Sequence, residues 1–291
     1  MAAFEDRHWQ SADGLSLHYR DYAGGEGRPP IFCIPGLTRN ARDFEELAER
    51  LAGDWRVIAV DLRGRGDSDY AKDAASYMPM TYVDDVLALL DELGLATVIA
   101  FGTSLGGLVT MLLAAKARDR LAGALLNDVG PEIDPAGLAR IRTYVGKSSS
   151  FPTWIHAARA VQEANADVYA DYAIDDWLKM AKRLYYVNGS GRIVLDYDMK
   201  IAEPFRAPGG EAAPDMWPAF DALAGLPVLI VHGARSDVLS AATAEKMAAR
   251  LPGSELVTVA GVGHTPTLGE PEVAAAIDRL LRRIAKEPVA A

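Results

Sequence analysis

The sequence predicts an α/β fold in which a mostly parallel central sheet is flanked by helices, with a helical cap inserted before the last two strands. Short β-branched or apolar runs alternate along the chain with longer stretches of helical spacing, which is typical of a parallel sheet covered by helices. One aromatic-rich stretch interrupts this alternation, where two neighbouring strands would need only a short crossover. That stretch is therefore predicted to lie outside the sheet.

Six runs are the predicted strands, at residues 31–34, 56–60, 97–101, 121–126, 226–232 and 255–259. Helices are expected in most of the intervals. Residues 81–93 have apolar side chains at helical spacing and stop at Gly94, and residues 271–284 give a closing helix. Ahead of these strands, residues 9–22 contain an Asp13-Gly14 turn and predict a β-hairpin.

The interrupting stretch, residues 132–217, is the expected cap, or lid. Residues 1–131 and 218–291 together are the expected α/β core, since half of the 291 residues are hydrophobic and suffice for one large core. Aromatic side chains of the cap are suited to packing it on the core or to closing a pocket. They include Tyr144, Phe151, Trp154, Tyr169, Tyr172, Trp177, Tyr185, Tyr186 and Trp217.

Charge and composition favour a small-molecule substrate. A net charge of −10 and a pI near 5.0 disfavour binding to nucleic acid or to an anionic membrane surface. Residues 1–10 lack the basic and apolar regions of a secretory signal, and no apolar run reaches the ~18 residues of a membrane span. We therefore expect a cytoplasmic protein, monomeric or homodimeric.

No cofactor and no metal are expected. Cys33 is the only cysteine, which excludes an internal disulfide and a cysteine-cluster metal site, and its place in a predicted core strand favours a buried apolar role. The histidines show no ligand spacing such as His-x-x-x-His. His8 and His18 lie in the predicted hairpin and are expected at the surface, whereas His232, at the end of a strand, is expected to be structural.

The stretch Gly102-Thr103-Ser104-Leu105-Gly106 carries the strongest chemical signal. It follows the apolar run 97–101 and precedes the apolar run 105–115, so Ser104 is expected on a sharp strand-to-helix turn that exposes its hydroxyl. An ordinary helix cap is the alternative role for this serine. The flanks favour a nucleophile.

Two residues downstream are suited to activate Ser104. Asp237 lies in a polar loop after the strand 226–232, and His264 lies in a glycine-rich loop after the strand 255–259. The order Ser, Asp, His is that of one known form of the catalytic triad. Two alternatives are open for the acid: Asp237 is also placed to cap a helix that begins near Ser240, and Asp128, after the strand 121–126, is a rival.

These motifs resemble the α/β-hydrolase superfamily over nearly the whole chain apart from residues 132–217. Ile34-Pro35-Gly36-Leu37 is similar to the family's oxyanion segment with proline in place of its usual histidine, and residues 61–68 (DLRGRGDS) resemble a turn that is structural in most relatives. The resemblance implies that the backbone N–H groups of Leu37 and Leu105 form the oxyanion hole. Arg39 and Asn40 follow this segment and are candidates for binding a substrate carboxylate or carbonyl.

The predicted function is hydrolysis of a small carboxylic ester or a lactone through an acyl-enzyme, with Ser104, His264 and Asp237 as the triad. A serine at the elbow argues against the dehalogenases and epoxide hydrolases of the superfamily, which use aspartate there. Carbon–carbon hydrolysis of diketones by the same triad is an alternative. A ligand receptor or slow hydrolase on this fold is another.

Overall fold

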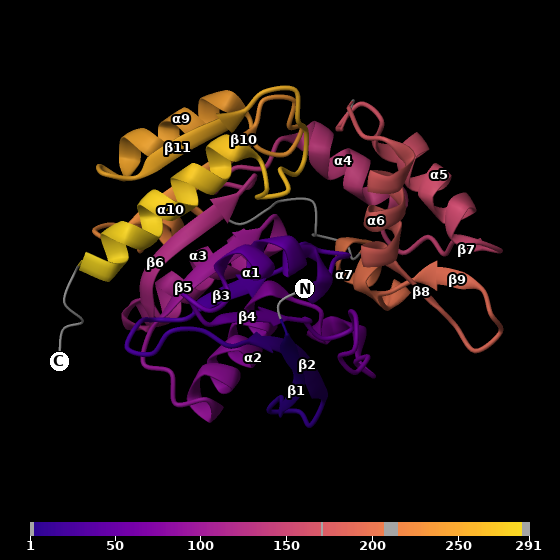
Figure 1. Ribbon diagram of the computed structural model, residues 1–291, viewed down its shortest axis with the longest axis horizontal. Coiled ribbons are helices and arrows are strands. Elements are labelled where there is room, and N and C mark those ends of the chain that lie inside the picture. Colours follow the sequence, from indigo (N-terminus) through magenta and orange to yellow (C-terminus); the bar gives the residue numbers. More distant parts are fainter. Residues whose placement is uncertain (1–2, 170, 207–214, 287–291) are drawn as a thin grey trace.

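The computed structural model describes residues 3–169, 171–206 and 215–286, and an eight-stranded sheet runs through its centre (Figure 1). In spatial order its strands are β1 (Phe4–Gln10), β2 (Ser16–Tyr22), β4 (Val57–Val60), β3 (Ile31–Ile34), β5 (Val98–Thr103), β6 (Leu121–Asn127), β10 (Val228–Gly233) and β11 (Glu255–Val259). All six predicted core strands and the predicted hairpin are present.

The sheet is mostly parallel, as the sequence predicts. Strands β4, β3, β5, β6, β10 and β11 pair in parallel, whereas β1 pairs antiparallel with β2 and β2 antiparallel with β4. A parallel strand with helices on both faces is buried on both sides, which explains the continuous apolar runs of β3 and β4. The fold class is thereby confirmed.

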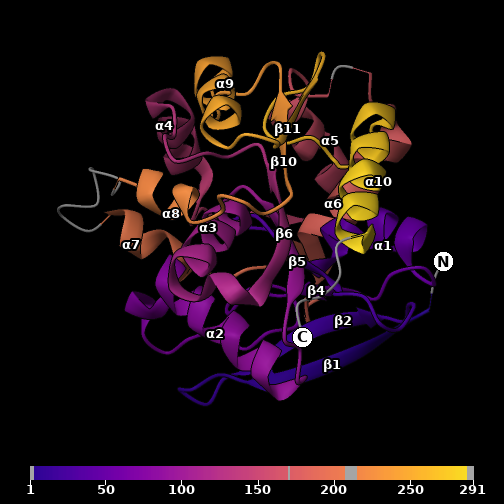
Figure 2. The same ribbon diagram turned by 90° about the vertical axis from the view of Figure 1, so that its left-hand side faces the viewer.

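Helices cover the two faces of the sheet (Figure 2). On one face lie α1 (Glu45–Leu51) and α10 (Pro271–Lys286), and on the other lie α2 (Pro79–Glu92), α3 (Leu105–Ala117), α8 (Trp217–Asp221) and α9 (Ala241–Arg250). None of the helices that the structure describes is long and apolar enough to cross a membrane.

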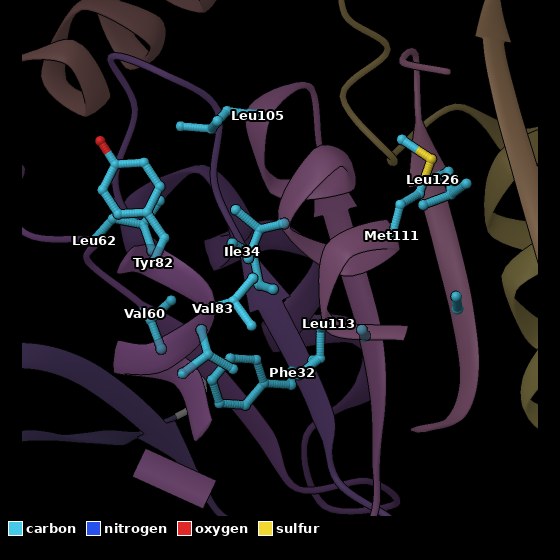
Figure 3. Close-up of a cluster of buried hydrophobic side chains, with 14 of the residues drawn as sticks. Phe32, Ile34, Val60, Leu62, Tyr82, Val83, Leu105, Met111, Leu113 and Leu126 are labelled. Atoms are coloured by element: carbon cyan, nitrogen blue, oxygen red, sulfur yellow. The ribbon is translucent and has the colours of Figure 1, made fainter. Parts of the chain in front are cut away.

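Alternate residues of β3 divide between these two layers. Phe32 and Ile34 belong to the cluster with α2 and α3 (Figure 3), and Ile31 and Cys33 belong to the cluster with α1 and α10. Cys33 is a free, fully buried thiol whose pKa is raised by burial, in keeping with the apolar role expected for it.

The strand order reverses between β3 and β5. From β3 the chain continues to β4 on one side, and it later returns to place β5 on the other side of β3, with Ile34 opposite Gly102. Ligands of open α/β sheets bind at the carboxyl ends of the strands at such a switch point. The oxyanion segment and Ser104 follow these two strand ends, so the topology brings them together.

The cap segment, residues 132–217, is not purely helical. It holds α4 (Pro135–Tyr144), α5 (Trp154–Asn165), α6 (Ile174–Leu184) and α7 (Glu203–Arg206), but also a three-stranded antiparallel sheet of β7 (Ser150–Phe151), β9 (Ile193–Leu195) and β8 (Tyr185–Val187). Strands of two or three residues are too short to show an alternating pattern, which is why the sequence did not predict them. Buried side chains of α5, α6, β8 and β9 form a hydrophobic cluster of their own.

Polar contacts tie the cap segment to the loop after β3. The 3₁₀ helix η1 (Ala41–Phe44) follows this loop, and the side chain of Asn40 caps it by accepting the Arg42 N–H at 3.1 Å. The Asn40 amide also donates to the Arg183 carbonyl at 2.9 Å, and the Arg42 guanidinium pairs with Asp196. The cap therefore lies beside the carboxyl ends of the strands, as Figure 1 shows.

Candidate active site

Ser104 lies on a strained turn between β5 and α3. Its φ is 52° and its ψ −115°, a conformation that side chains rarely adopt. Glycine is required on both sides. A Cβ at position 102 would lie 2.3 Å from the Gly106 carbonyl oxygen, and one at position 106 would lie 2.0 Å from the Ile34 carbonyl oxygen. The backbone is thus packed around the turn so that the Ser104 hydroxyl projects at the start of a helix.

A chain of two hydrogen bonds begins at this hydroxyl. Ser104 Oγ lies 2.9 Å from His264 Nε2, and His264 Nδ1 lies 2.8 Å from Asp128 Oδ2. The three residues follow β5, β11 and β6, so three separate loops at one edge of the sheet supply them. This is the geometry in which an imidazole takes a proton from a hydroxyl while a carboxylate holds the imidazole in place.

Asp128 is fully buried and hydrogen-bonded by more than His264. Its Oδ1 accepts the Gly233 N–H at 2.8 Å, and its Oδ2 accepts the Ser236 hydroxyl at 2.6 Å. Its backbone is in the left-handed region, with a φ of 56°. Buried carboxylates need such donors, and here the last residue of β10 and the loop after it provide one each.

Asp237, the acid expected from the sequence, does not meet His264, and this expectation is corrected. Asp237 pairs instead through both carboxylate oxygens with Arg140 of α4, in the cap segment. That hydrogen bonding lowers the pKa of Asp237, against the opposing effect of burial. Nor does it cap α9, because the Ser240 side chain accepts from the Thr243 N–H there.

The sheet order gives the physical reason for this difference. β6 lies directly beside β5, which carries Ser104, whereas β10 is one strand further away. The loop of His264, after β11, reaches past β10 and meets the acid that follows β6. Asp128, the rival that the sequence left open, therefore occupies the position expected for Asp237.

The oxyanion segment lies beside Ser104. A Cβ at Gly36 would lie 3.6 Å from Ser104 Cβ, so the backbone approaches the serine closely there. The Leu37 carbonyl accepts from Arg65 Nε at 2.9 Å, which fixes the orientation of that peptide. Leu105 is the first residue of α3, where backbone N–H groups have no acceptor within the helix. The role of the Leu37 and Leu105 amides stays a prediction.

Arg65 was missed as a positioning residue. It belongs to the turn at residues 61–68, which the sequence assigned to structure alone, and its guanidinium is fully buried. Besides Leu37 it donates to the Arg63 carbonyl at 2.6 Å and to the Tyr82 hydroxyl at 3.1 Å. The turn is structural, as expected, and it also supports the oxyanion segment.

Arg39 and Asn40 differ in what they offer a substrate. Asn40, a candidate for binding substrate, is buried, and both ends of its side-chain amide are engaged in the contacts that cap η1 and hold the cap segment. These contacts favour a structural role for Asn40. The Arg39 side chain is 25% exposed and pairs with Asp43.

His18, expected at the surface, is buried between two carboxylates. Its Nδ1 lies 2.8 Å from Asp61 and its Nε2 2.9 Å from Asp6. Burial lowers the pKa of His18, but the carboxylates outweigh this and hold it above its ordinary value. His8 is exposed, as expected, and His232 is buried 3.3 Å from the Thr258 hydroxyl.

Among the described residues, one group has the donor types to hold a metal ion. His18, Asp61 and Asp67 present ligand atoms within 4.8 Å of one another. Asp61, however, already accepts the Ala41 and Asp67 N–H groups, at 2.6 Å and 3.0 Å, and a raised pKa favours a protonated His18. This donor set is thus occupied in holding the hairpin to the turn.

Comparison with known proteins shows the family of this chain. The chain matches the model of the alpha/beta hydrolase family over residues 31–277. It is 37% identical to a 3-hydroxybutyrate-oligomer hydrolase from Cupriavidus necator, over 88% of this chain and 89% of the relative. It is 29% identical to a 2-(acetamidomethylene)succinate hydrolase from Mesorhizobium japonicum, over 89% of this chain and 88% of the relative.

A solved structure is similar over almost its whole length. The crystal structure of an alpha/beta hydrolase from Novosphingobium aromaticivorans superposes with a TM-score of 0.93 at 61% identity, covering 97% of this chain and 99% of that one. The chain therefore belongs to the alpha/beta hydrolase family, and it is a hydrolase.

Proposed function

We propose that this hydrolase cleaves small carboxylic esters or lactones through an acyl-enzyme, with Ser104 as nucleophile, His264 as base and Asp128 as acid. The observation that carries the proposal is the continuous hydrogen-bonded chain from Ser104 Oγ through His264 to the Asp128 carboxylate. Asp128 replaces Asp237 in the mechanism first expected.

Acylation begins with attack of Ser104 Oγ on the ester carbonyl carbon. His264 Nε2 takes the hydroxyl proton, and the Asp128 carboxylate stabilises the imidazolium through its bond to Nδ1. The tetrahedral oxyanion accepts hydrogen bonds from the Leu37 and Leu105 amides. When the carbon–oxygen bond of the alcohol breaks, His264 returns the proton to the leaving oxygen.

Deacylation repeats these steps with water in place of Ser104. His264 takes a proton from the water as its oxygen attacks the acyl carbon, and it then protonates Ser104 Oγ as the acid is released. The strained backbone of Ser104 keeps the hydroxyl in the same position for both halves of the cycle.

The cap segment is proposed as a lid that limits the substrate to compact molecules. Tyr169 of the cap donates a hydrogen bond to the carbonyl of Thr265, which directly follows His264, so the cap contacts the catalytic loop itself. Residues 1–131 and 218–291 are then the core beneath the lid. A small-molecule substrate in the cytoplasm stays the expectation.

Esters between hydroxyacid units are the first substrates to test. The name of the Cupriavidus necator relative gives 3-hydroxybutyrate oligomers as its substrate, and the similarity spans 88% of this chain. Their short acyl groups suit a site covered by a lid.

Steady-state hydrolysis tests the proposal. The substrates are p-nitrophenyl esters from acetate to decanoate, a few lactones and the linear dimer of 3-hydroxybutyrate. The wild type is expected to turn over at least one of them, and Ser104→Ala is expected to lower kcat by roughly 10⁴-fold or more. The thermal unfolding of the variant, measured alongside, controls for the fold.

Persistent turnover by rigorously purified Ser104→Ala would contradict the proposal. A folded wild type that hydrolyses none of these substrates would point to carbon–carbon hydrolysis or to ligand sensing.

A further inference from the structure

Arg39 is a cationic side chain beside the oxyanion segment, and unlike Arg65, whose guanidinium is fully buried, it is partly exposed. A Cβ at Gly36 would lie 3.3 Å from Arg39 Cγ and 3.6 Å from Ser104 Cβ, so the stem of the arginine and the nucleophile flank the same backbone atom. The mechanism proposed above does not use this guanidinium.

Asp43 fixes the orientation of this guanidinium. Arg39 lies just ahead of η1, and its Nε and Nη2 each donate to a different oxygen of Asp43, within η1, both at 2.6 Å. A guanidinium carries more N–H donors than this pairing uses, so one edge is held by Asp43 and other N–H groups remain to be offered elsewhere. The side chain is 25% exposed, which leaves it within reach of a ligand.

Tyrosines of the cap segment interact electrostatically with this cation. Burial raises the pKa of the Tyr144, Tyr169 and Tyr185 hydroxyls, and Arg39 is close enough to each to oppose that rise. Tyr169 also contacts the carbonyl of Thr265, beside His264. The stem of Arg39 therefore lies beside Gly36 and near Ser104, and its charge acts on tyrosines of the cap segment.

We propose that Arg39 is a specificity-determining residue that binds a free carboxylate of the substrate, so that the preferred esters carry a carboxylate group. The inference rests on the ester hydrolysis proposed above. A planar, oriented guanidinium in a partly buried site matches a carboxylate in shape and charge better than it matches a neutral group. Asp43 then acts as the positioning residue that aims it.

A matched pair of substrates tests this assignment. One is the linear dimer of 3-hydroxybutyrate with its free carboxylate, and the other is the same dimer with that group converted to a primary amide. Both contain one identical ester. The readout is the ratio of kcat/KM for the acid to kcat/KM for the amide. Arg39→Gln is expected to lower this ratio by about 10- to 100-fold, mainly through KM for the acid.

Three further variants exclude other causes. Arg39→Gln leaves Asp43 unpaired, and the negative charge of Asp43 would itself repel a substrate carboxylate. The double variant Arg39→Gln/Asp43→Asn removes this negative charge and is expected to keep the low ratio. Arg39→Lys keeps the charge without the planar fork and should lower the ratio less. Arg56→Gln is the matched control, because Arg56 makes the same two-pronged pair with Asp21, at 2.9 Å and 2.7 Å, ahead of β4. It should leave the ratio unchanged.

The outcomes are distinct. A ratio that returns to the wild-type value in the double variant, or an equal loss for both substrates in Arg39→Gln, would show that Arg39 only supports the loop and would overturn the proposal. If the wild type hydrolyses neither dimer, the result contradicts the proposed ester hydrolysis of these dimers and leaves the carboxylate site to be tested by binding. Calorimetric titration of Ser104→Ala with both dimers is that test. Tighter binding of the acid that is lost in Ser104→Ala/Arg39→Gln supports the carboxylate site, and equal or absent binding of both dimers overturns it.

Discussion

Two histidine–aspartate pairs of this protein have nearly the same geometry and different chemistry. His264 Nδ1 lies 2.8 Å from Asp128, and His18 Nδ1 lies 2.8 Å from Asp61. The difference is at the other ring nitrogen. His264 Nε2 faces the Ser104 hydroxyl, whereas His18 Nε2 faces a second carboxylate, at 2.9 Å.

This difference decides what each imidazole can do. A ring between a carboxylate and a hydroxyl can accept the hydroxyl proton and return it, which a general base requires. A ring between two carboxylates is stabilised in its protonated form, because both nitrogens then donate to anions, and the pKa of His18 is accordingly raised, which makes this ring poorly suited to accept a further proton. A buried His–Asp pair therefore identifies a base only together with the group on the far nitrogen.

The largest effect expected from this comparison is on catalysis. Asp128→Asn should lower kcat for the best ester substrate by roughly 10³- to 10⁴-fold, because the amide cannot stabilise the imidazolium and favours the wrong tautomer of His264. Asp237→Asn, which removes a partner of Arg140 instead, should lower kcat by less than about 10-fold. Steady-state kinetics of the two variants under the same conditions measures the contrast.

Asp61→Asn is the control for this prediction, since it alters the other histidine pair. It is expected to lower the free energy of unfolding while kcat stays within a few-fold of wild type. A larger loss of kcat in Asp237→Asn than in Asp128→Asn would reverse the assignment of the acid.

The contrast between the two acids also shows how far the sequence can predict this site. Ser104 and His264 could be placed because each sits at a glycine-rich turn directly after a strong apolar strand. Asp128 and Asp237 both follow strands as well, so chain order alone does not separate them. What selects Asp128 is its left-handed backbone together with the Ser236 hydroxyl from another loop, and neither can be read from neighbouring residues.

The same limit explains the error at His18. The core strands and helices could be predicted because long apolar runs dominate their local pattern. His18 was expected at the surface, but β2 lies between β1 and β4, and its consecutive residues Leu17, His18 and Tyr19 are all buried. Burial on both faces of a strand depends on which segments pack on each face of the sheet, and that is set by the whole chain.

A smaller, pH-dependent effect on the free energy of unfolding is expected from the pair of His18 and Asp61. The pKa of His18 is raised in the folded protein, so its protonation stabilises the fold fully below the unfolded pKa of about 6.5 and this gain is lost as pH rises through the folded pKa. His18→Gln should therefore lower the free energy of unfolding by about 1–3 kcal/mol at pH 5.5 and by less at pH 9. Urea unfolding at the two pH values measures the difference.

His8→Gln is the matched control, because His8 lies opposite His18 on β1 and is exposed. Its effect should stay within about 0.5 kcal/mol at both pH values. A cost of His18→Gln that grows from pH 5.5 to pH 9 would show that the wild-type ring is neutral, and the contrast drawn with His264 would then fail.

The smallest effect is expected where Asp237 meets the cap. In its pair with Arg140 both side chains are more than one-third exposed, 38% for Arg140 and 34% for Asp237, so solvent screens the attraction. A double-mutant cycle of Arg140→Gln and Asp237→Asn, followed by urea unfolding, should give a coupling energy of about 0–1 kcal/mol.

Kinetics of the same variants tests the assignment of the two acids further, because removing either partner breaks the same contact between α4 and the loop after β10. Both single variants should therefore change kcat/KM alike and modestly, whereas a strong loss confined to Asp237→Asn would mean that this carboxylate acts on His264 and not through Arg140.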